Sequence, residues 1–381
     1  MQIIGVLAFV VALLFSVMIH EFGHYLTARH YGMKVSEFFL GFGKRLWSTR
    51  RGETEFGIKA IPAGGYCRIE GMAPSDEMPI GEEDRAFYKA SSGKKLIVLG
   101  AGSFLHFVLG YLLLFTLFAG VGTNQVLPVI GEVVSKSAAA DAGVKAGDEI
   151  ISINGVLVTN WYKDVEAIRN SGGKALTLGI KRAGQQITIN ATPRLTDVNG
   201  TQRYVLGIIN TIGVKRSGLI QSTSYAFTTT KNFVVQSVNS LLALPSKIPA
   251  LWGQTVRGEK RDANGLVGVV GVARVSGQAV GDSQLSISER VATFILIVAS
   301  LNIFVGVFNV LPILPLDGGH MAVAIADEIR AFLARLRGRP RPAAIDVTVL
   351  TPITMVVFVI LASLTLLLLV ADVINPVNLN L

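Results

Sequence analysis

Residues 3–19 read IIGVLAFVVALLFSVMI, and the chain continues directly with HEFGH at residues 20–24. The apolar run contains no charged side chain, and an α-helix needs about 20 such residues to cross a hydrocarbon core of about 30 Å. A retained membrane span that ends in ionisable groups is therefore predicted. A signal peptide is the alternative interpretation, but no basic residue precedes the run and no small-residue cleavage site follows it.

The composition extends this prediction to the whole chain. Half of the 381 residues are hydrophobic and only 16% are charged, whereas soluble domains carry about 25% charged residues. Three further runs lack Lys, Arg, Asp and Glu, namely 96–121, 291–316 and 353–371. Each is long enough to cross a bilayer as a helix, so we expect a polytopic α-helical membrane protein with about four transmembrane helices.

Basic residues at the ends of the predicted spans indicate the orientation. They precede the second and the fourth span, at Lys94, Lys95, Arg335, Arg337, Arg339 and Arg341. Because short basic loops stay cytoplasmic, residues 29–95 and 320–350 are expected inside, with residues 123–290 and both termini outside. The net charge of +9 fits this topology and attraction to anionic membrane lipid. No nucleic-acid partner is expected, because the basic residues are not interleaved with stacking aromatics.

The external region is expected to begin with a β-rich domain. Residues 143–158 read GVKAGDEIISINGVLV, in which Asn154-Gly155 is a hairpin-type turn. A helix is predicted over 161–171, and a second hairpin follows in which apolar side chains alternate. This order resembles a PDZ domain, a fold that binds peptides by adding a strand to a sheet edge. Another small β-sandwich is the alternative.

Two other segments have recognisable patterns. Residues 41–71 are rich in glycine, and polar and apolar residues roughly alternate between the glycines, which predicts a small β-hairpin or looped sheet. Residues 217–260 are amphipathic and are predicted to be helical, with interruptions at Pro245 and Pro249. That region either lies on the outer membrane surface or forms a linker that packs on the PDZ-like domain.

The HEFGH motif predicts a zinc site. In a helix, His20 and His24 lie on one face and are able to bind one ion, and Glu21 is then placed to act as general base on a metal-bound water. Ionisable groups inside a span cost about 2.5–3.5 kcal/mol each. A bound metal would compensate for that cost. The alternative interpretation of the motif is a polar helix end that reaches into the membrane interface without a metal.

A catalytic zinc usually has three protein ligands. Cys67 is the only cysteine, which excludes an intrachain disulfide and a cysteine cluster. The apolar spans offer His106 and Asp317 as the third ligand. Asp317 follows the third span and reaches the same membrane side as His24, whereas His106 lies about 15 Å deep in the second span. Asp317 is therefore the predicted ligand.

The surroundings of Asp317 support this choice. Residues 309–319 read NVLPILPLDGG, and Pro312 and Pro315 break a helix at membrane depth. Irregular backbone is tolerated there only inside protein or along a wet cavity, such as a substrate groove. The structural alternative is that the prolines and glycines simply end the span.

Together these motifs resemble the site-2 protease family of intramembrane zinc metalloproteases. The resemblance rests on HEFGH, on NVLPILPLDGG and on GFGKRLWSTRRGETEFGIKAIPAGGYC at 41–67. The PDZ-like domain between the catalytic spans narrows it to the bacterial, single-PDZ, actinobacterial-type branch. One zinc ion held by residues matching His20, His24 and Asp317 is implied, with Glu21 activating water.

The resemblance also implies roles outside the metal site. The position of Asn309 is implied to bind unwound substrate backbone, and the segment up to Gly64 and Gly65 resembles a membrane re-entrant β-loop that presents substrate as an added strand. The PDZ domain is implied to filter substrates by size. One departure concerns residues 101–106, AGSFLH, where many relatives have an asparagine at the position of His106. A hydrogen-bonding role near the site and a packing role both remain open for it.

The predicted function is cleavage within transmembrane segments of single-span membrane proteins, for example an anti-sigma factor after a first external cut. The expected location is the plasma membrane, with multiple spans. The alternatives are a membrane zinc endopeptidase of another class, a metal transporter and a non-enzymatic PDZ adaptor. The chain is predicted to divide into nine segments. These are the first transmembrane helix with the zinc motif (1–28), the cytoplasmic or re-entrant β-loop region (29–95), the second transmembrane helix (96–122), the PDZ-like domain (123–215), the extracytoplasmic amphipathic helical region (216–290), the third transmembrane helix with the Asp317 motif (291–319), the cytoplasmic basic loop (320–350), the fourth transmembrane helix (351–372) and the C-terminal tail (373–381).

Overall fold

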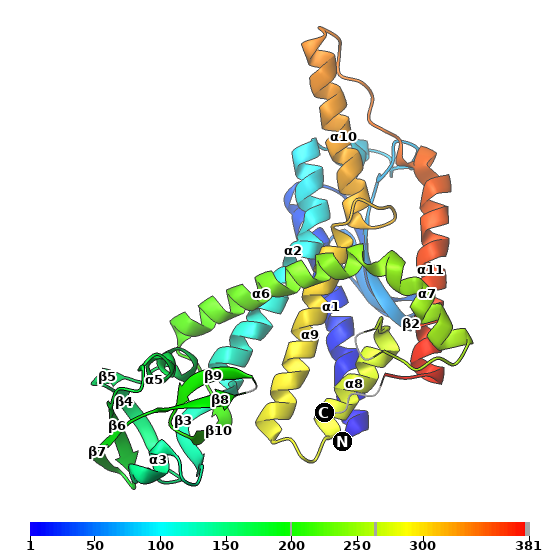
Figure 1. Ribbon diagram of the computed structural model, residues 1–381. Coiled ribbons are helices and arrows are strands. Elements are labelled where there is room, and N and C mark those ends of the chain that lie inside the picture. The colour runs from blue at the N-terminus through cyan, green and yellow to red at the C-terminus, as the bar shows by residue number, and fades with distance from the viewer. Residues whose placement is uncertain (199, 263–264, 378–381) are drawn as a thin grey trace. The chain divides into compact units, whose positions relative to one another are not determined.

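The computed structural model describes residues 1–198, 200–262 and 265–377 (Figure 1). The chain forms two compact units. One consists of Met1–Val121 and Ser217–Leu381, and the other is Gly122–Arg216. Each unit is built around its own packed interior, and the first carries the membrane-length helices and the candidate site.

Four helices of the first unit are long and apolar enough to cross a membrane. They are α1 (Gln2–His30), α2 (Ser92–Thr116, extended by a π-helical turn over Leu117–Val121), α9 (Ile287–Asn309) and α11 (Thr351–Ile374). In the part of the chain that the structure describes, the prediction of about four spans is therefore confirmed at the level of length and composition.

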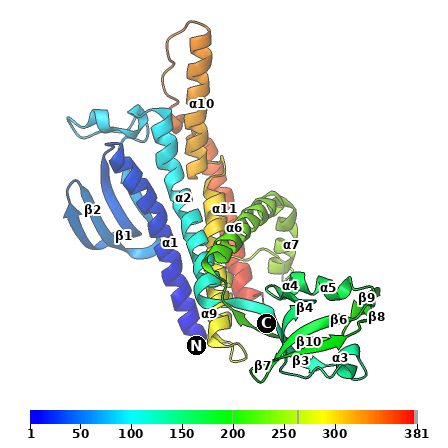
Figure 2. The same cartoon turned by 90° about the vertical axis from the view of Figure 1, so that its left-hand side faces the viewer.

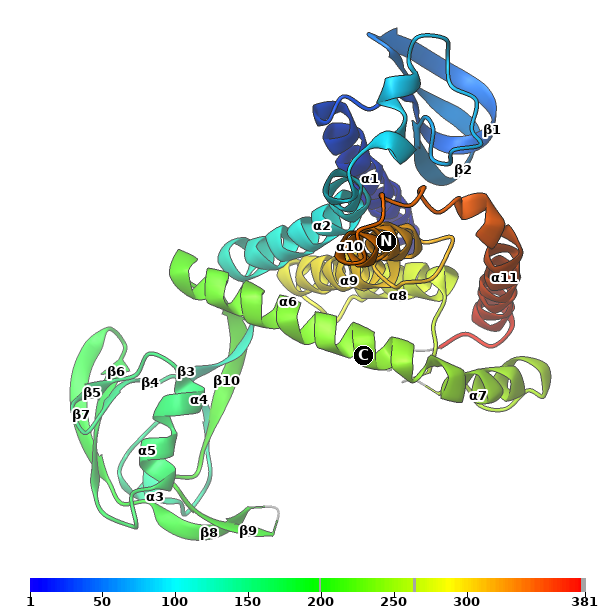
Figure 3. The same ribbon diagram turned by 90° about the horizontal axis from the view of Figure 1, so that it is seen from above.

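The helices α1, α2 and α9 pack side by side (Figure 3). Glycines at their crossings allow this close approach. A Cβ atom on Gly23 would lie 2.6 Å from the carbonyl oxygen of Ala101, and one on Gly110 would lie 2.7 Å from Ile303. Because neither position has room for a side chain, the backbones of α1 and α2 and those of α2 and α9 are held together at these two points.

Four further helices belong to the first unit. They are α6 (Leu219–Leu242), α7 (Leu244–Val256), α8 (Val269–Gly281) and α10 (Asp317–Leu336). The helices α6 and α7 correspond to the predicted amphipathic region. The sequence predicts only a basic loop over 320–350, whereas α10 forms a helix over much of it. Its exposed side chains Ile325, Ile329 and Phe332 follow helical spacing.

The predicted hairpin of the first unit is present as β1 (Val35–Arg51) and β2 (Thr54–Ile69), which pair antiparallel. Figure 2 shows it beside α1. The pairing shifts register around Gly41 and Gly43, whose φ angles of +87° and +82° are left-handed and favour glycine. On β2, a Cβ atom on Gly65 would lie 2.7 Å from the Met18 sulfur, so this strand runs directly against the helix that carries the HEFGH motif.

The second unit contains a six-stranded antiparallel sheet with the order β10-β3-β4-β6-β7, in which β5 pairs with β4. Its strands are β3 (Thr123–Val133), β4 (Glu149–Ile153), β5 (Val156–Leu157), β6 (Leu176–Arg182), β7 (Gln185–Ala191) and β10 (Ile208–Lys215), and β8 (Arg194–Val198) pairs separately with β9 (Thr201–Val205). The short helices are α3 (Ala138–Asp141), α4 (Trp161–Asp164) and α5 (Glu166–Arg169).

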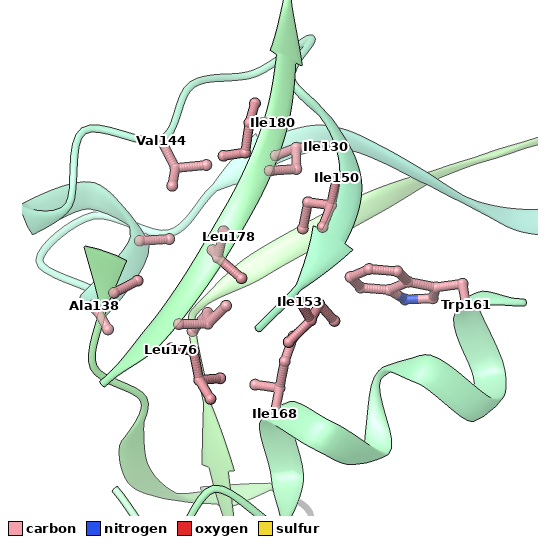
Figure 4. Packing of buried hydrophobic residues seen from close by; sticks show 13 residues of the cluster. Ile130, Ala138, Val144, Ile150, Ile153, Trp161, Ile168, Leu176, Leu178 and Ile180 are labelled. Atoms are coloured by element: carbon pink, nitrogen blue, oxygen red, sulfur yellow. The ribbon is translucent and has the colours of Figure 1, made fainter. Parts of the chain in front are cut away.

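The core of this unit is apolar, with Ile150, Leu178 and Ile180 nearly inaccessible and Trp161 and Ile168 packed beside them (Figure 4). The alternation predicted for the second hairpin places Leu176, Leu178 and Ile180 on this inner face, as expected for a sheet with one buried side. The β4–β5 turn uses Asn154 and Gly155, both with positive φ.

An ion pair between a buried aspartate and a partly exposed arginine joins the start of β4 to the end of β6 in this unit. Asp148 lies just before β4, and its side chain is 1% exposed. It accepts two hydrogen bonds of 2.7 Å from Nε and Nη2 of Arg182 at the end of β6. These bonds lower the pKa of the Asp148 carboxyl below its ordinary value, with the Lys145 backbone amide assisting.

We therefore expect Arg182→Gln to destabilise this unit at neutral pH, because it leaves the Asp148 carboxylate without its charged hydrogen-bond donor. Because the folded-state pKa is lowered, the stabilisation is present above the ordinary Asp pKa and is lost as pH falls through the lowered value. Amide hydrogen exchange of the full chain should show faster exchange in β4 and β6. The exposed pair Arg169–Glu166 provides the control: Arg169→Gln should leave exchange unchanged, and equal effects of both variants would contradict the prediction.

Candidate metal centre

Three side chains from two distant segments of the first unit, α1 and the start of α10, meet at one point. Nε2 of His20 lies 3.0 Å from Nε2 of His24. The Oδ2 atom of Asp317 lies 3.1 Å from Nε2 of His20 and 3.3 Å from Nε2 of His24. Among the residues that the structure describes, these form the only group of three histidine, cysteine or carboxylate side chains able to hold one metal ion.

The spacing of these atoms fits a zinc ion. Zinc–nitrogen and zinc–oxygen bonds of about 2.0–2.2 Å at tetrahedral angles place neighbouring ligand atoms roughly 3.3 Å apart. The three measured separations of 3.0–3.3 Å are close to this value. Two imidazoles and one carboxylate form a donor set that zinc uses in proteases, and three protein ligands leave a fourth position for water.

The helix α1 and its contact with α2 orient the two histidines. His24 donates from Nδ1 to the Val98 carbonyl of α2, at 2.8 Å, which leaves its Nε2 lone pair free for a metal. The His20 ring lies against the backbone of α2, where a Cβ atom on Gly102 would be 2.5 to 2.7 Å from three ring atoms. Gly102 therefore leaves the space that the His20 imidazole occupies.

The break between α9 and α10 places Asp317 beside the two histidines. The helix α9 ends at Asn309, and Asp317 is the first residue of α10. Gly318 and Gly319 sit tightly against the intervening segment, since a Cβ on Gly318 would be 2.3 Å from Val310 and one on Gly319 would be 2.5 Å from Leu314. The chain thereby folds back on itself, and the carboxylate points at the end of α1 instead of continuing along α9.

Comparison with known proteins identifies the family of this chain. The family model described as peptidase family M50 matches residues 8–360. The chain belongs to peptidase family M50. The predicted membership of the site-2 protease family is thereby confirmed.

Curated relatives agree with this assignment. The zinc metalloprotease Rip1 of Mycobacterium tuberculosis H37Rv is 33% identical over an alignment 414 positions long, which covers 100% of this chain and 99% of the relative. Rip1 of Mycolicibacterium smegmatis is 34% identical, covering 98% of each chain. A putative zinc metalloprotease of Helicobacter pylori J99 is 32% identical, covering 82% of this chain and 87% of the relative. The chain is thus a zinc metalloprotease, and the part of it that the structure describes contains four membrane-length helices.

Glu21 lies beside the three candidate metal ligands of this M50 protease. Its carboxylate interacts electrostatically with His20, His24 and Asp317, and with the backbone amide of Cys67 on β2. The residue therefore lies between the candidate ligands and the hairpin. A carboxylate beside the three candidate ligands is where a general base would be expected, and this role of Glu21 remains a prediction.

His106 lies in a polar network next to the site. Its side chain is 2% exposed, and its ring centre is 5.0 Å from that of His20. Its Nδ1 atom lies 2.9 Å from Oδ1 of Asn302 on α9. Asn302 also contacts Ser16 of α1. His106 therefore takes part in a hydrogen-bonded network, and packing alone does not describe it. Sequence analysis did not single out Asn302, although an amide within an apolar span was the available signal.

The residues expected to bind substrate lie nearby but outside the three-ligand group. Asn309 is half-buried at the last residue of α9. Gly64 and Gly65 belong to β2, and Gly65 contacts α1 two residues before His20. Their binding roles remain predictions. Cys67 is a half-buried free thiol on the same strand.

Gly102→Ala should weaken zinc binding, because the added methyl group would displace the His20 ring from its position. We expect zinc affinity to fall by about 10–100-fold, the size of effect seen when ligand orientation is lost. Affinity is measured by chelator competition on the full chain. Gly100→Ala is the matched control, because its Cβ would meet only the Met321 methyl group at 3.8 Å. Equal zinc affinity of the two variants would contradict the assigned role of Gly102.

Proposed function

We propose that this zinc metalloprotease hydrolyses peptide bonds within the transmembrane segments of single-span membrane proteins. The observation that carries the proposal is the position of the three candidate ligands. Two lie on α1 directly after an apolar run of membrane length, and the third follows a helix break at the end of α9. A substrate that reaches these residues would be a membrane-embedded chain.

In the proposed mechanism His20, His24 and Asp317 hold one zinc ion. When bound, zinc lowers the pKa of a coordinated water to about 7 and polarises the scissile carbonyl. Glu21 takes the proton from the attacking water and delivers it to the leaving amine. The Val98 carbonyl holds the His24 ring in the orientation that keeps Nε2 available.

The substrate must lose its helical structure before cleavage, because intrahelical hydrogen bonds occupy its carbonyl groups. The hairpin β1–β2 is a two-stranded sheet, and a two-stranded sheet has unpaired strand edges able to accept an added strand. We propose that substrate pairs with this hairpin near Gly64 and Gly65, and that Asn309 binds its unwound backbone. The contact of β2 with α1 near Met18 supports delivery of such a strand to Glu21.

We further propose that residues 122–216 form a PDZ-like domain outside the plasma membrane. The support is a sheet capped by short helices, together with the basic residues before α2 and α11, which favour a cytoplasmic location for the opposite loops. In that position the domain would admit substrates whose external part has been removed, such as a pre-cut anti-sigma factor.

Glu21→Gln should retain zinc and lower cleavage by about 10²–10⁴-fold, the usual contribution of a general base. Cleavage of a single-span peptide with a short external segment is followed by mass spectrometry, with wild type and variant in detergent. Wild-type cuts should fall inside the span, stop when zinc is chelated and resume when zinc is restored.

Two comparisons define the result. Asp317→Ala should lose both zinc and cleavage, whereas Asp346→Asn, at the cap of the short helical turn before α11, should lose neither. Cleavage confined to peptides without a span would replace the proposal with a membrane endopeptidase acting on soluble peptides. Near-normal turnover by Glu21→Gln would remove Glu21 as the base.

A further inference from the structure

One nitrogen of the candidate metal site has no partner. The Nδ1 atom of His20 is buried and makes no hydrogen bond to any residue that the structure describes. The corresponding atom of His24 bonds to the Val98 carbonyl. Because a zinc-binding histidine almost always donates its other N–H to an acceptor, His20 lacks the second interaction that His24 has.

His106 lies beside His20 and has a ring nitrogen able to accept this hydrogen bond. Which nitrogen of His106 carries the hydrogen follows from a chain of hydrogen bonds. The Ser16 hydroxyl donates to the Ala12 carbonyl at 2.8 Å. The Ser16 oxygen must therefore accept from Asn302, whose amide nitrogen lies 3.0 Å away and also donates to the Val298 carbonyl. The Asn302 atom that faces His106 is consequently its oxygen, which is an acceptor only.

It follows that Nδ1 of His106 carries the hydrogen of the bond to Asn302. In a neutral imidazole the other nitrogen, Nε2, is then an acceptor. The neutral form is the one expected for a ring that is 2% exposed beside residues that would hold a divalent cation.

We propose that Nε2 of His106 accepts the Nδ1–H of His20, so that the chain Ser16–Asn302–His106 orients the first zinc ligand. The ring centres of His20 and His106 are 5.0 Å apart, and a direct N–H···N bond between two imidazoles places their centres roughly 5 Å apart. The bond is not formed in the structure, where Nδ1 of His20 has no hydrogen-bond partner, so the two rings must reorient to form it. His106 is thus a positioning residue, and the inference rests on the proposed metal role of His20.

The test measures the zinc affinity of the full chain in detergent by chelator competition. His106→Phe keeps a ring but removes the acceptor, so affinity should fall by about 10–100-fold. His106→Gln supplies an acceptor oxygen and should restore most of the loss. Ser103→Ala, one turn away on α2, should bind zinc like wild type. Cobalt-loaded His106→Phe should show a shifted visible spectrum, and cobalt-loaded Ser103→Ala should not.

The outcomes separate this inference from the function on which it rests. A wild-type chain that binds no zinc would refute the metal centre itself. Normal zinc binding by wild type and by His106→Phe would overturn only the role of His106. Equal loss in the Phe and Gln variants would also overturn it, because ring packing and not hydrogen bonding would then be responsible.

A second observation, independent of the metal site, concerns a pocket of about 690 Å³ between the start of α2 and the middle of α10. One part of its wall is apolar and is formed by Leu96, Ile325, Ile329 and Phe332. The other part carries Arg335 and Arg341. Apolar and basic walls that meet where an apolar span begins are suited to a molecule with a charged head and an apolar tail.

The charges around the pocket leave a positive excess. The carboxylate of Glu328 is engaged by Arg341 at 3.0 Å and by the Ser92 hydroxyl at 2.9 Å. Arg335 takes part in none of the ion pairs found among the described residues. Lys95, one residue before Leu96, does not line the pocket, and its Nζ lies 5.9 Å from the centre of the Phe87 ring.

We infer that this pocket binds an anionic phospholipid. Arg335 and Arg341 would hold its phosphate, and Ile329 and Phe332 would contact an acyl chain. Basic pockets between membrane helices bind acidic headgroups through such contacts. The apolar wall distinguishes this site from the diffuse attraction of a basic loop.

The test is native mass spectrometry of the full chain titrated with phosphatidylglycerol, phosphatidylcholine of the same acyl chains, and glycerol phosphate. Phosphatidylglycerol should bind most tightly. Arg335→Gln combined with Arg341→Gln should weaken its binding by about 30-fold, from about 1 kcal/mol per basic residue. The matched control is Arg337→Gln with Arg339→Gln, in the same basic segment but outside the pocket.

Glu328→Gln provides a second control, because it removes the same ion pair as the Arg341 change but keeps the arginine. Its lipid binding should equal or exceed that of wild type. Loss equal to that of the two-arginine variant would overturn the site, since a structural role of the pair would explain both. Equal loss in the Arg337 and Arg339 variant, or equal binding of phosphatidylcholine or glycerol phosphate, would also overturn it.

Discussion

The side chains of His20, His24 and Asp317 meet at the end of the apolar run of α1. The packing of the surrounding helices depends on keeping these three groups together. Each group is costly in apolar surroundings, so the three must face one another and, in the proposed enzyme, a cation. Gly23 and Gly102 permit α2 to lie against α1 closely enough to enclose His20. The break after α9 turns Asp317 toward the same place. Removing any one of these features would leave a buried polar group without its partner.

The same constraint explains why the helices carry a few internal polar residues. Ser16, His106 and Asn302 come from α1, α2 and α9, and all are buried. A polar side chain at such a position is tolerated when its hydrogen bonds are made within the protein. Their network joins the helices that flank the metal centre. Such hydrogen bonds link helices in an apolar medium, where apolar packing alone gives little specificity. In the proposed arrangement they also fix the orientation of the His20 ring.

The hairpin and the break in the helices have complementary chemical roles in the proposed cleavage. A protease that acts on helices needs extended substrate, and β2 offers a strand edge next to α1. The proposed general base Glu21 is on α1, and Gly65 and Asp317 both contact that helix, although the three residues are far apart in the sequence. At the other end of α10, the basic pocket lies where the apolar span of α2 begins, so the two proposed sites depend on different parts of that helix.

The sequence alone determined the membrane spans, the histidine pair and the candidate third ligand, because these depend on local hydrophobic patterning and helical spacing. It also indicated the hairpin and the alternating strands of the second unit. The helix α10 was missed, since its apolar stripe lies within a basic segment. Only the tertiary structure decided the partners of the ligands: the Val98 carbonyl for His24, the glycine surface beneath His20, and the network from Ser16 to His106. These contacts join residues from different helices, and their geometry depends on how closely the helix backbones approach, which no local pattern encodes.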